Sequence, residues 1–429
     1  MKKVLEFILR VLGRSILKIY KPKVIAITGS VGKTSTKDAI FTVLESKYNA
    51  RASLKNYNNE IGVPLTIIGC VSPTTSVIGW SLVFLKALGL IFIRDKKYPE
   101  YLVLEMGADH PGDISYLIKI APPNVAVITF IAGVHIEYFK SIEAILKEKL
   151  SITSRMKDKS PVIVNIDNEY LRESLPTLSR FQIISFGFSS EAKVRAYDDQ
   201  LLIDSTNSYR VLGMEFTLSY LDSDVRVHLP GIISRPQIYA ALAAASVGIA
   251  EGIVINEIAN SLKMYRLPPG RMRMFPGVKE TLIIDDSYNA SPSSAIAALL
   301  SVSKLPIREG AKKWAVFGDM LELGESSSVG HKNVGIAAVG HGFDYLLTVG
   351  MRARDIGKGA KSAGMSEDNV FSFDDTEAAG KFVEDRISKG DIILIKGSQG
   401  ARMERVVKEL MAEPLRAKEL LVRQDASWL

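Results

Sequence analysis

The fold is decided by one stretch near the start of the chain, Val24-Ile25-Ala26-Ile27-Thr28-Gly29-Ser30-Val31-Gly32-Lys33-Thr34-Ser35. The apolar run that opens it predicts a buried strand, and a helical pattern begins at Lys33. A glycine-bearing turn between a strand and a helix points backbone N–H groups at a chain of phosphates. Lys33 would reach the outer phosphates, and Thr34 or Ser35 would offer a hydroxyl to Mg²⁺. The usual pattern has a further glycine where this chain has Ile27, so the pattern is met only in its second half.

Strands and helices alternate after this loop, with short connections between them. The pattern predicts strands at 101–104, 125–128 and 162–164, and helices at 33–45, 112–120 and 141–156. Such an alternation predicts a parallel sheet that is covered by helices on both faces. Period-2 patterns between 193 and 230 then predict a small antiparallel extension, and an alanine-rich helix over 234–251 closes the unit.

The segment Arg266-Leu267-Pro268-Pro269-Gly270 is the best candidate linker, because two prolines and a glycine cannot continue the preceding helix. A second alternating series follows, with strands predicted at 282–284, 314–317, 345–347 and 392–395 and helices near 291–304, 328–340, 376–389 and 401–411. This series predicts a separate Rossmann-like α/β domain. We therefore expect an α/β protein with a basic amphipathic segment at 1–22, a central P-loop domain with a mostly parallel sheet at 23–267, and a C-terminal domain at 268–429.

The composition is that of an ordinary globular protein. The chain has 429 residues, of which 47% are hydrophobic and 24% charged, and this excludes a disordered, collagen-like or disulfide-scaffold protein. Cys70 is the single cysteine and no cleavage site follows the first apolar run, so we expect a cytoplasmic protein. The net charge of +7 is compatible with anionic ligands such as nucleotides. The sequence has no nucleic-acid-binding pattern.

Two apolar stretches raise the question of a membrane. Residues 1–20 combine apolar positions with three basic residues on one helical stripe, which is typical of a helix on an anionic membrane surface or of a helix docked on its own domain. Residues 76–93, inside an apolar insertion at 72–97, are long enough to cross a bilayer but contain a lysine. We expect this second stretch to pack on the protein or to lie in the interface. Both stretches together predict peripheral membrane contact.

Polar side chains follow two further strands of the first predicted sheet. Glu105 ends the strand at 101–104, and His135 follows the strand at 125–128. The carboxyl ends of parallel strands meet at one edge of a sheet, where ligands bind in such folds. A carboxylate and an imidazole beside the phosphate loop therefore predict a metal site that is formed with Thr34.

Seven short motifs follow one another along the chain. They lie at Ile27–Thr34, Asn56–Pro64, Glu105–Ala108, His135–Phe139, Asp285–Ala290, Gly318–Gly324 and Lys396–Ser398. In this order the chain resembles the Mur ligase family, the ATP-dependent amide ligases of cell-wall precursor synthesis. The motifs Asp-Asp-Ser-Tyr-Asn-Ala and Gly-Asp-Met-Leu-Glu-Leu-Gly favour the members that add a dipeptide.

The resemblance implies an enzyme that uses ATP and Mg²⁺ to join D-alanyl-D-alanine to a muramoyl-peptide carboxylate through an acyl phosphate. It implies catalytic roles for Lys33, His135 and Lys149, and a Mg²⁺-binding role for Glu105 and His135. Arg271 would bind the phosphates of ATP, and Asn289 its adenine.

The role of Lys149 comes from the resemblance alone. Family members carbamylate the corresponding lysine, which turns a cation into a carboxylate-like group that helps to bind a second metal ion. The residues after Lys149 depart from the usual pattern, so Lys147 is a rival for this role. Both lysines could also lie on a solvated helix face.

Further residues are implied in substrate binding. Asn58 and Asn59 would bind the nucleotide-sugar peptide or order the loop around them. Asp319, Glu322 and His331 would handle the incoming amine, although helix caps use the same residue types. We expect a monomer.

The chain departs from the family before the phosphate loop. Members normally have a domain for the UDP-sugar there, whereas 27 residues precede Thr28 in this chain. We therefore expect the UDP-binding domain to be missing, and the acceptor to be presented near a membrane or held by a partner. Alternatives are another amide ligase of the superfamily, such as a polyglutamate-type ligase, or a non-catalytic ATP-binding subunit.

Overall fold

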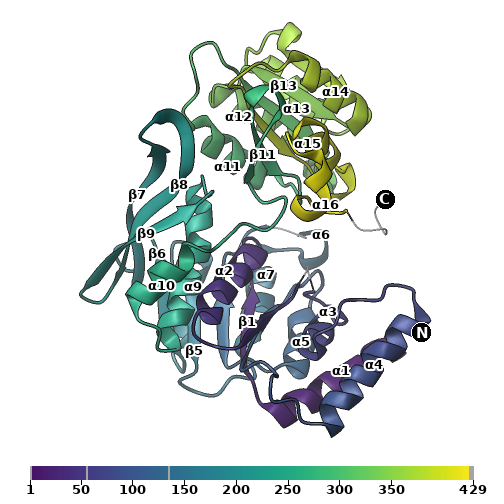
Figure 1. Ribbon diagram of the computed structural model, residues 1–429, viewed down its shortest axis with the longest axis vertical. Helices are drawn as coiled ribbons and strands as arrows, with labels where there is room; N and C mark the ends of the chain where they lie inside the picture. Colours follow the sequence, from purple (N-terminus) through teal and green to yellow (C-terminus); the bar gives the residue numbers. More distant parts are fainter. Residues whose placement is uncertain (1, 55–56, 134–135, 425–429) are drawn as a thin grey trace. The chain divides into compact units, whose positions relative to one another are not determined.

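The computed structural model describes residues 2–54, 57–133 and 136–424, which form two compact units (Figure 1). The first unit comprises Met1–Asp199, Glu215–Leu229 and Pro236–Arg266. The second comprises Gln200–Met214, Pro230–Arg235 and Leu267–Leu429. Residues 200–214 therefore group with the second unit rather than with the segments on either side of them.

The first unit contains most of a sheet with the strand order β2-β3-β1-β4-β5-β6-β7-β8-β9; the parts of β7 and β8 within 200–214 belong to the second unit. The strands are β1 (Lys23–Thr28), β2 (Ala50–Ala52), β3 (Tyr101–Glu105), β4 (Val125–Ile128), β5 (Pro161–Asn165), β6 (Gln182–Gly187), β7 (Val194–Asp204), β8 (Asn207–Tyr220) and β9 (Ser223–Pro230). The pairs from β2 through to β7 are parallel. Ile27 pairs with Glu105 and Thr28 with Ile128, so the chain leaves β1, β3 and β4 at the same edge.

Helices pack on this sheet because its central strands are buried apolar runs. The helices are α1 (Lys2–Tyr20), α2 (Lys33–Glu45), α3 (Gly62–Ile68), α4 (Val77–Phe92), α5 (Asp113–Ile120), α6 (Ile136–Phe139), α7 (Ile142–Leu150), α8 (Glu169–Ser174), α9 (Arg235–Ala250) and α10 (Ile255–Leu262). Apolar residues of α1, α3, α4, α5 and α7 share one core with alternate residues of β1 and β3, such as Ala26 and Leu104.

The second unit has a sheet with the strand order β10-β11-β15-β12-β13-β14, in which only the β10–β11 pair is antiparallel. The strands are β10 (Arg273–Pro276), β11 (Leu282–Asp286), β12 (Lys313–Gly318), β13 (Tyr345–Val349), β14 (Val370–Phe373) and β15 (Ile392–Lys396). The helices are α11 (Pro292–Ser303), α12 (Ser327–Gly340), α13 (Arg354–Ser362), α14 (Thr376–Arg386), α15 (Glu404–Leu410) and α16 (Ala417–Leu420). Asp286 pairs with Lys396, so the ends of β11 and β15 lie together.

The predicted α/β fold is confirmed, with differences in single elements. The helix expected over 141–156 ends at Leu150 and continues as a 3₁₀ turn, Ser151–Thr153. The Ser151 hydroxyl there bonds to Glu148 O at 2.6 Å, a local bond that competes with further helix. The stretch at 76–93 forms α4, which packs on the first unit. Within the residues described, no helix is both long and apolar enough to cross a membrane.

Candidate functional site

The phosphate loop lies between β1 and α2 and is held against the residues that follow β4. Ser30 donates its backbone N–H to Phe130 O at 2.7 Å and its hydroxyl to Ala132 O at 2.9 Å. Gly29 has φ 147°, and a Cβ there would lie 2.1 Å from Thr129 Oγ1, so only glycine fits. The neighbouring strands therefore preform the loop.

Gly32 and Lys33 form the entrance to α2. Gly32 has φ 85°, and a Cβ there would meet nothing within 4 Å, so the requirement at this position is conformational. Lys33 Nζ donates to Gly29 O at 2.8 Å and to Ser30 O at 3.4 Å, which places the ammonium group over the loop. A helix N-terminus with a lysine above it provides a positive site for phosphate.

Glu105 lies beside the loop and is 2% exposed. Its carboxylate accepts hydrogen bonds from Thr34 Oγ1 at 3.0 Å and from Asn58 Nδ2 at 3.1 Å. Carboxylate and hydroxyl oxygens are ligands that Mg²⁺ prefers, so Thr34 and Glu105 fit the predicted ion. His135 lies outside the described residues. In the described part of the chain, no three His, Cys, Asp or Glu side chains lie close enough to hold a metal by themselves.

The two asparagines predicted to bind substrate have different neighbours. Asn58 fixes the Glu105 carboxylate, as described above. Asn59 Oδ1 accepts the backbone N–H groups of Ile61 at 3.2 Å and Gly62 at 2.9 Å. Asn59 therefore orders the turn that leads into α3.

Lys149 lies on α7 with its side chain directed into the first unit. The residue is 2% exposed, and Nζ donates to Ala108 O at 3.4 Å. Burial, and then the nearby charge of Lys33, lower the pKa of Lys149 to about 7. Much of the amine is therefore neutral near pH 7. Lys147, by contrast, is exposed.

Polar residues also gather at the edge of the second sheet. Lys396 Nζ donates to Asp286 Oδ2 at 2.5 Å and to Asn289 O at 2.9 Å, so it closes the turn between β11 and α11. Asp285 is completely buried, and burial raises the pKa of its carboxyl to about 6. Its Oδ1 accepts the backbone N–H of Ser287 at 3.0 Å.

Arg271 contacts Tyr288, the residue that precedes Asn289. The Arg271 guanidinium carbon is 4.0 Å from the centroid of the Tyr288 ring, and the Tyr288 N–H donates to Gly270 O at 3.0 Å. Asn289 is exposed, and its Oδ1 accepts the N–H of Ala290 at 2.9 Å. The turn after β11 thus carries Asn289 and, through Tyr288, contacts Arg271.

The residues predicted to handle the amine differ in exposure. Glu322 is exposed, with φ 62°. Asp319 Oδ1 accepts the backbone N–H of Ala353 at 2.7 Å, next to the start of α13. His331 is completely buried: Nε2 accepts the N–H of Met320 at 3.0 Å, and Nδ1 lies 2.7 Å from Ser327 O.

Two family models match successive parts of the chain. A family model described as the Mur ligase middle domain matches residues 27–78 and 86–248. The chain belongs to the Mur ligase family. A second model, described as Mur ligase, glutamate ligase domain, matches residues 270–399.

Several named Mur ligases are similar along most of their length. UDP-N-acetylmuramoyl-tripeptide–D-alanyl-D-alanine ligase of Bacillus subtilis is 31% identical over 408 residues, which cover 95% of this chain and 80% of that protein. The Escherichia coli enzyme of the same name is 31% identical, with 90% and 76% covered. Among solved structures, the MurF ligase of Thermotoga maritima in complex with ADP has a TM-score of 0.76 and 28% identity, with 94% and 83% covered.

Glu148 is a residue of this Mur ligase that the sequence patterns did not single out. It is 8% exposed, and its carboxylate accepts the backbone N–H groups of Gly112 at 2.9 Å and Ile114 at 2.8 Å. It therefore binds the N-terminal end of α5. Glu148 fixes α7, and with it Lys149, against the loop after β3. In the sequence, its position next to Lys149 is the feature that could have indicated a role for Glu148.

Arg423 was also missed. Its guanidinium donates to Ser287 O at 2.5 Å, to Tyr288 O at 3.2 Å and, through Nε, to Glu404 Oε2 at 3.1 Å. Glu404 is completely buried. The last described segment of the Mur ligase therefore braces the turn that carries Asn289, and no local pattern in the sequence indicates this.

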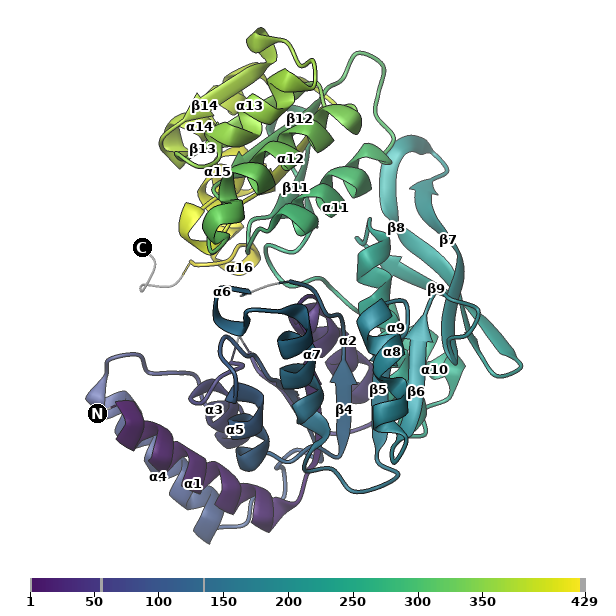
Figure 2. The same cartoon turned by 180° about the vertical axis from the view of Figure 1, so that it is seen from behind.

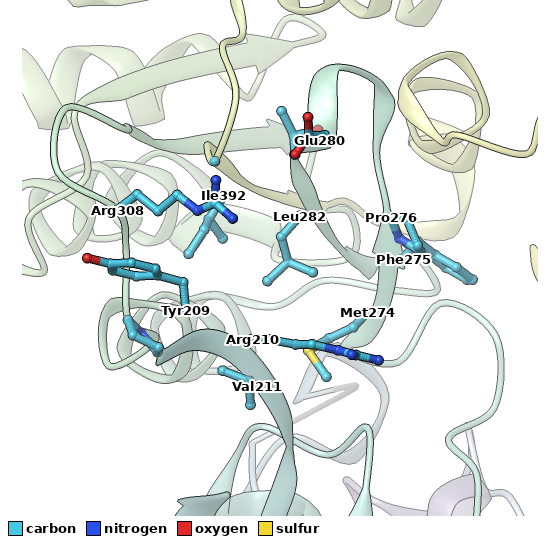
Figure 3. Close-up of a pocket in the computed structure, with 13 residues that line it drawn as sticks. Tyr209, Arg210, Val211, Met274, Phe275, Pro276, Glu280, Leu282, Arg308 and Ile392 are labelled. Atoms are coloured by element: carbon cyan, nitrogen blue, oxygen red, sulfur yellow. The ribbon is translucent and has the colours of Figure 1, made fainter. Parts of the chain in front are cut away.

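A cavity of about 310 Å³ in the second unit is separate from these residues (Figure 3). Tyr209, Arg210 and Val211 line it together with residues of β10, β11 and β15. The Arg308 guanidinium carbon lies 5.8 Å from the centroid of the Tyr209 ring. The predicted site residues of the Mur ligase do not line this cavity.

Proposed function

We propose that this Mur ligase forms an amide bond between D-alanyl-D-alanine and a carboxylate of UDP-N-acetylmuramoyl-tripeptide, while ATP is converted to ADP and phosphate. The observation that carries the proposal is the preformed loop at 28–35, with Lys33 over it and Glu105 bonded to Thr34 beside it. The 31% identity to two enzymes named for this reaction supports the choice of substrates.

The residues of the first unit are assigned to the phosphates of ATP. ATP supplies the phosphoryl group that turns a carboxylate oxygen into a good leaving group, and Mg²⁺ neutralises part of the phosphate charge. The loop at 28–35 orients the phosphates, and Lys33 stabilises the negative charge that develops on them. Thr34, Glu105 and His135 are assigned to Mg²⁺.

Lys149 is assigned the role of a carbamylated lysine. Its neutral amine would attack CO₂, so that an N–C bond forms and a proton leaves to water. The product is an anionic carbamate in place of a cation. The pKa of about 7 supports this role, because an ammonium group has no lone pair for the attack.

The remaining residues are assigned to the substrates. Arg271 is assigned to the phosphates of ATP and Asn289 to the adenine, while Asp319 and Glu322 are assigned to the amine. His331 receives a positioning role on the loop at 320–322, because both of its ring nitrogens are used inside the second unit. Asn58 and Asn59 are assigned to the acceptor or to its loop.

The proposal also covers the organisation of the chain. We propose that the chain consists of a basic amphipathic segment at 1–22, a central ATP-binding domain at 23–267 and a C-terminal domain at 268–429. We also propose that the protein is a cytoplasmic monomer and that residues 1–20 and 76–93 contact a membrane peripherally.

The experiment is an assay of ADP release and product mass with purified full-length protein. We expect ADP only when UDP-N-acetylmuramoyl-tripeptide, D-alanyl-D-alanine and Mg²⁺ are all present, and a product whose mass equals the two substrates less water. Reactions without one substrate, or with L-alanyl-L-alanine, are the controls. ADP release with glutamate as the amine would favour a polyglutamate-type ligase. Absence of ADP release with every acid and amine offered would contradict an enzymatic role.

A further inference from the structure

Helices α1 and α4 form a pair on the outside of the first unit. Figures 1 and 2 both show them side by side, beyond α3 and α5. Leu9 and Ile16 of α1 and Val83 and Ala87 of α4 are buried in the core that these helices share with the sheet. One apolar face thus attaches the pair, and the opposite face is exposed.

One exposed side of α4 carries apolar side chains from the first turn of the helix to the last. Its outward side chains are Val77, Ile78, Leu82, Leu85 and Phe92, each at least 62% exposed. At 3.6 residues per turn these positions share one side of the helix. Ser81 lies among them, and the exposed Lys86 lies at the edge of this side, where its Nζ donates to Gly69 O at 2.6 Å. On α1, Val4, Phe7 and Val11 are exposed as well. Apolar surface of this extent on a folded protein marks an interaction site.

Basic residues accompany this surface. Residues 2–22 and 76–97 contain ten basic and two acidic side chains, so their net charge exceeds the +7 of the entire chain. Arg94, Lys96 and Lys97 are exposed directly after α4, and Arg14 and Lys18 are exposed on α1. These two segments therefore carry a net charge as large as that of the whole protein.

Specific contacts hold the pair in one orientation on the sheet domain. The Tyr20 hydroxyl, at the end of α1, donates to Leu90 O at 3.0 Å and accepts the N–H of Asp95 at 2.8 Å. The Tyr20 ring stacks on Tyr98 with 4.1 Å between centroids. The apolar face is thus presented as a defined surface of the unit.

We propose that α1 and α4 dock this Mur ligase on an anionic lipid bilayer, with the apolar side chains of α4 at the boundary between headgroups and acyl chains. A bilayer is favoured over a protein partner because the face offers few hydrogen-bonding groups and the charge beside it is predominantly positive. The family model matches on either side of residues 79–85, so the middle of α4 lies outside the shared match. The inference does not rest on the ligase activity.

The test is flotation of the full-length protein with vesicles of equal parts phosphatidylglycerol and phosphatidylcholine, compared with phosphatidylcholine alone. We expect binding to the anionic vesicles to be at least about tenfold stronger. The variant Leu82→Ser, Leu85→Ser, Phe92→Ser should bind them at least about tenfold more weakly, with an unchanged melting temperature. The matched control Leu221→Ser, Met351→Ser, Leu415→Ser removes as many exposed apolar side chains elsewhere and should bind as the unchanged protein does.

A second variant tests the charges without touching the apolar face. Arg94→Glu, Lys96→Glu, Lys97→Glu should abolish the preference for anionic vesicles. Equal binding by the protein and its α4 variant, or equal binding to neutral and anionic vesicles, would overturn the proposal. So would a concentration-dependent dimer in ultracentrifugation that the α4 variant abolishes, because the face would then belong to a second copy of the chain.

Discussion

Lys149 in the first unit and Lys396 in the second are both 2% exposed, yet their surroundings are opposite. Lys396 forms an ion pair with Asp286 at 2.5 Å and also donates to Asn289 O. Lys149 donates to Ala108 O at 3.4 Å, and no ion pair of its ammonium group occurs in the part of the chain that is described. Burial lowers the pKa of Lys149 to about 7.

The difference distinguishes a lysine that stabilises a turn from one that is suited to the reactive role proposed for Lys149. A buried ammonium group is costly unless a carboxylate and further acceptors surround it, as they surround Lys396. Without such partners the group loses its proton more easily, and a neutral lysine can act as a nucleophile. Burial alone therefore does not identify a reactive lysine; the partners of its ammonium group do.

The largest expected effect is on the rate of ADP release and comes from Lys33 in the first unit. Lys33→Ala should lower the rate of ADP release about 10³-fold, because charge that develops on the phosphates loses its nearest cation. The same change should raise the pKa of Lys149, because the positive charge of Lys33 is one of the causes that lower this pKa. Steady-state kinetics and the pH dependence of labelled CO₂ uptake measure the two effects. Lys119→Ala, an exposed lysine, is the control; unchanged ADP release in Lys33→Ala would contradict the loop assignment.

The next effect tests the structural lysine. Lys396→Met should lower the free energy of unfolding by about 3 kcal/mol, because it leaves Asp286 buried without its partner. Urea denaturation, followed by the fluorescence of Trp314 in the same sheet, measures the change. The double variant Lys396→Met, Asp286→Asn should regain part of the loss. An unchanged free energy of unfolding in Lys396→Met would mean that the ion pair between Lys396 and Asp286 does not stabilise the turn.

The reactive lysine should show a smaller loss, in rate rather than in stability. Lys149→Met should lower the ligase rate about 10²-fold, because it removes the amine on which the carbamate is proposed to form. Lys147→Met, two positions away and exposed, should leave the rate unchanged. ¹³C NMR with labelled bicarbonate should show a carbamate signal that is absent from Lys149→Met. A loss in Lys147→Met instead would transfer the role to that residue.

Lys149 also predicts how stability depends on pH. Its pKa is lowered in the folded protein, so the unfolded state binds more protons between about pH 7 and the ordinary lysine value of 10.5. The contribution of Lys149 to stability therefore rises with pH across that window and is constant above it. Melting temperatures between pH 7 and 9 should rise less steeply in Lys149→Met than in the unchanged protein. Parallel curves would contradict the lowered pKa.

The smallest expected effect concerns the brace on the second unit. Arg423→Ala should raise the KM for ATP about fivefold, equivalent to about 1 kcal/mol, because it frees the turn that carries Asn289. The kcat should stay the same. Arg416→Ala, an exposed residue that pairs with Glu413 and Glu419, is the control. A fall in kcat at constant KM would argue against a role in holding the nucleotide.

Much of the fold could be predicted because its central strands are buried on both faces and appear as unbroken apolar runs. β4 and α2 have the predicted bounds, Val125–Ile128 and Lys33–Glu45. β2 was missed because it has three residues, and α13 because it contains two glycines, which are poor helix formers.

The positions of the phosphate loop and of Glu105 could be predicted, because local motifs mark them. Lys149 and Lys147 could not be distinguished by spacing, since only the packing of α7 decides which of them is buried. Arg423 could not be found at all, because it contacts Tyr288 across 135 positions of the chain.

The number of residues between Ser141 and Lys149 in helix α7 is constrained by the contacts at its two ends. The Ser141 hydroxyl caps its start by accepting the N–H of Ala144, and the two successive residues Glu148 and Lys149 project about 100° apart near its end. One inserted or deleted residue within the helix would rotate both side chains off their targets at once. We therefore expect related sequences to have insertions and deletions before Ser141 but not between Ser141 and Lys149. Substitutions on the outer face of the helix should be tolerated.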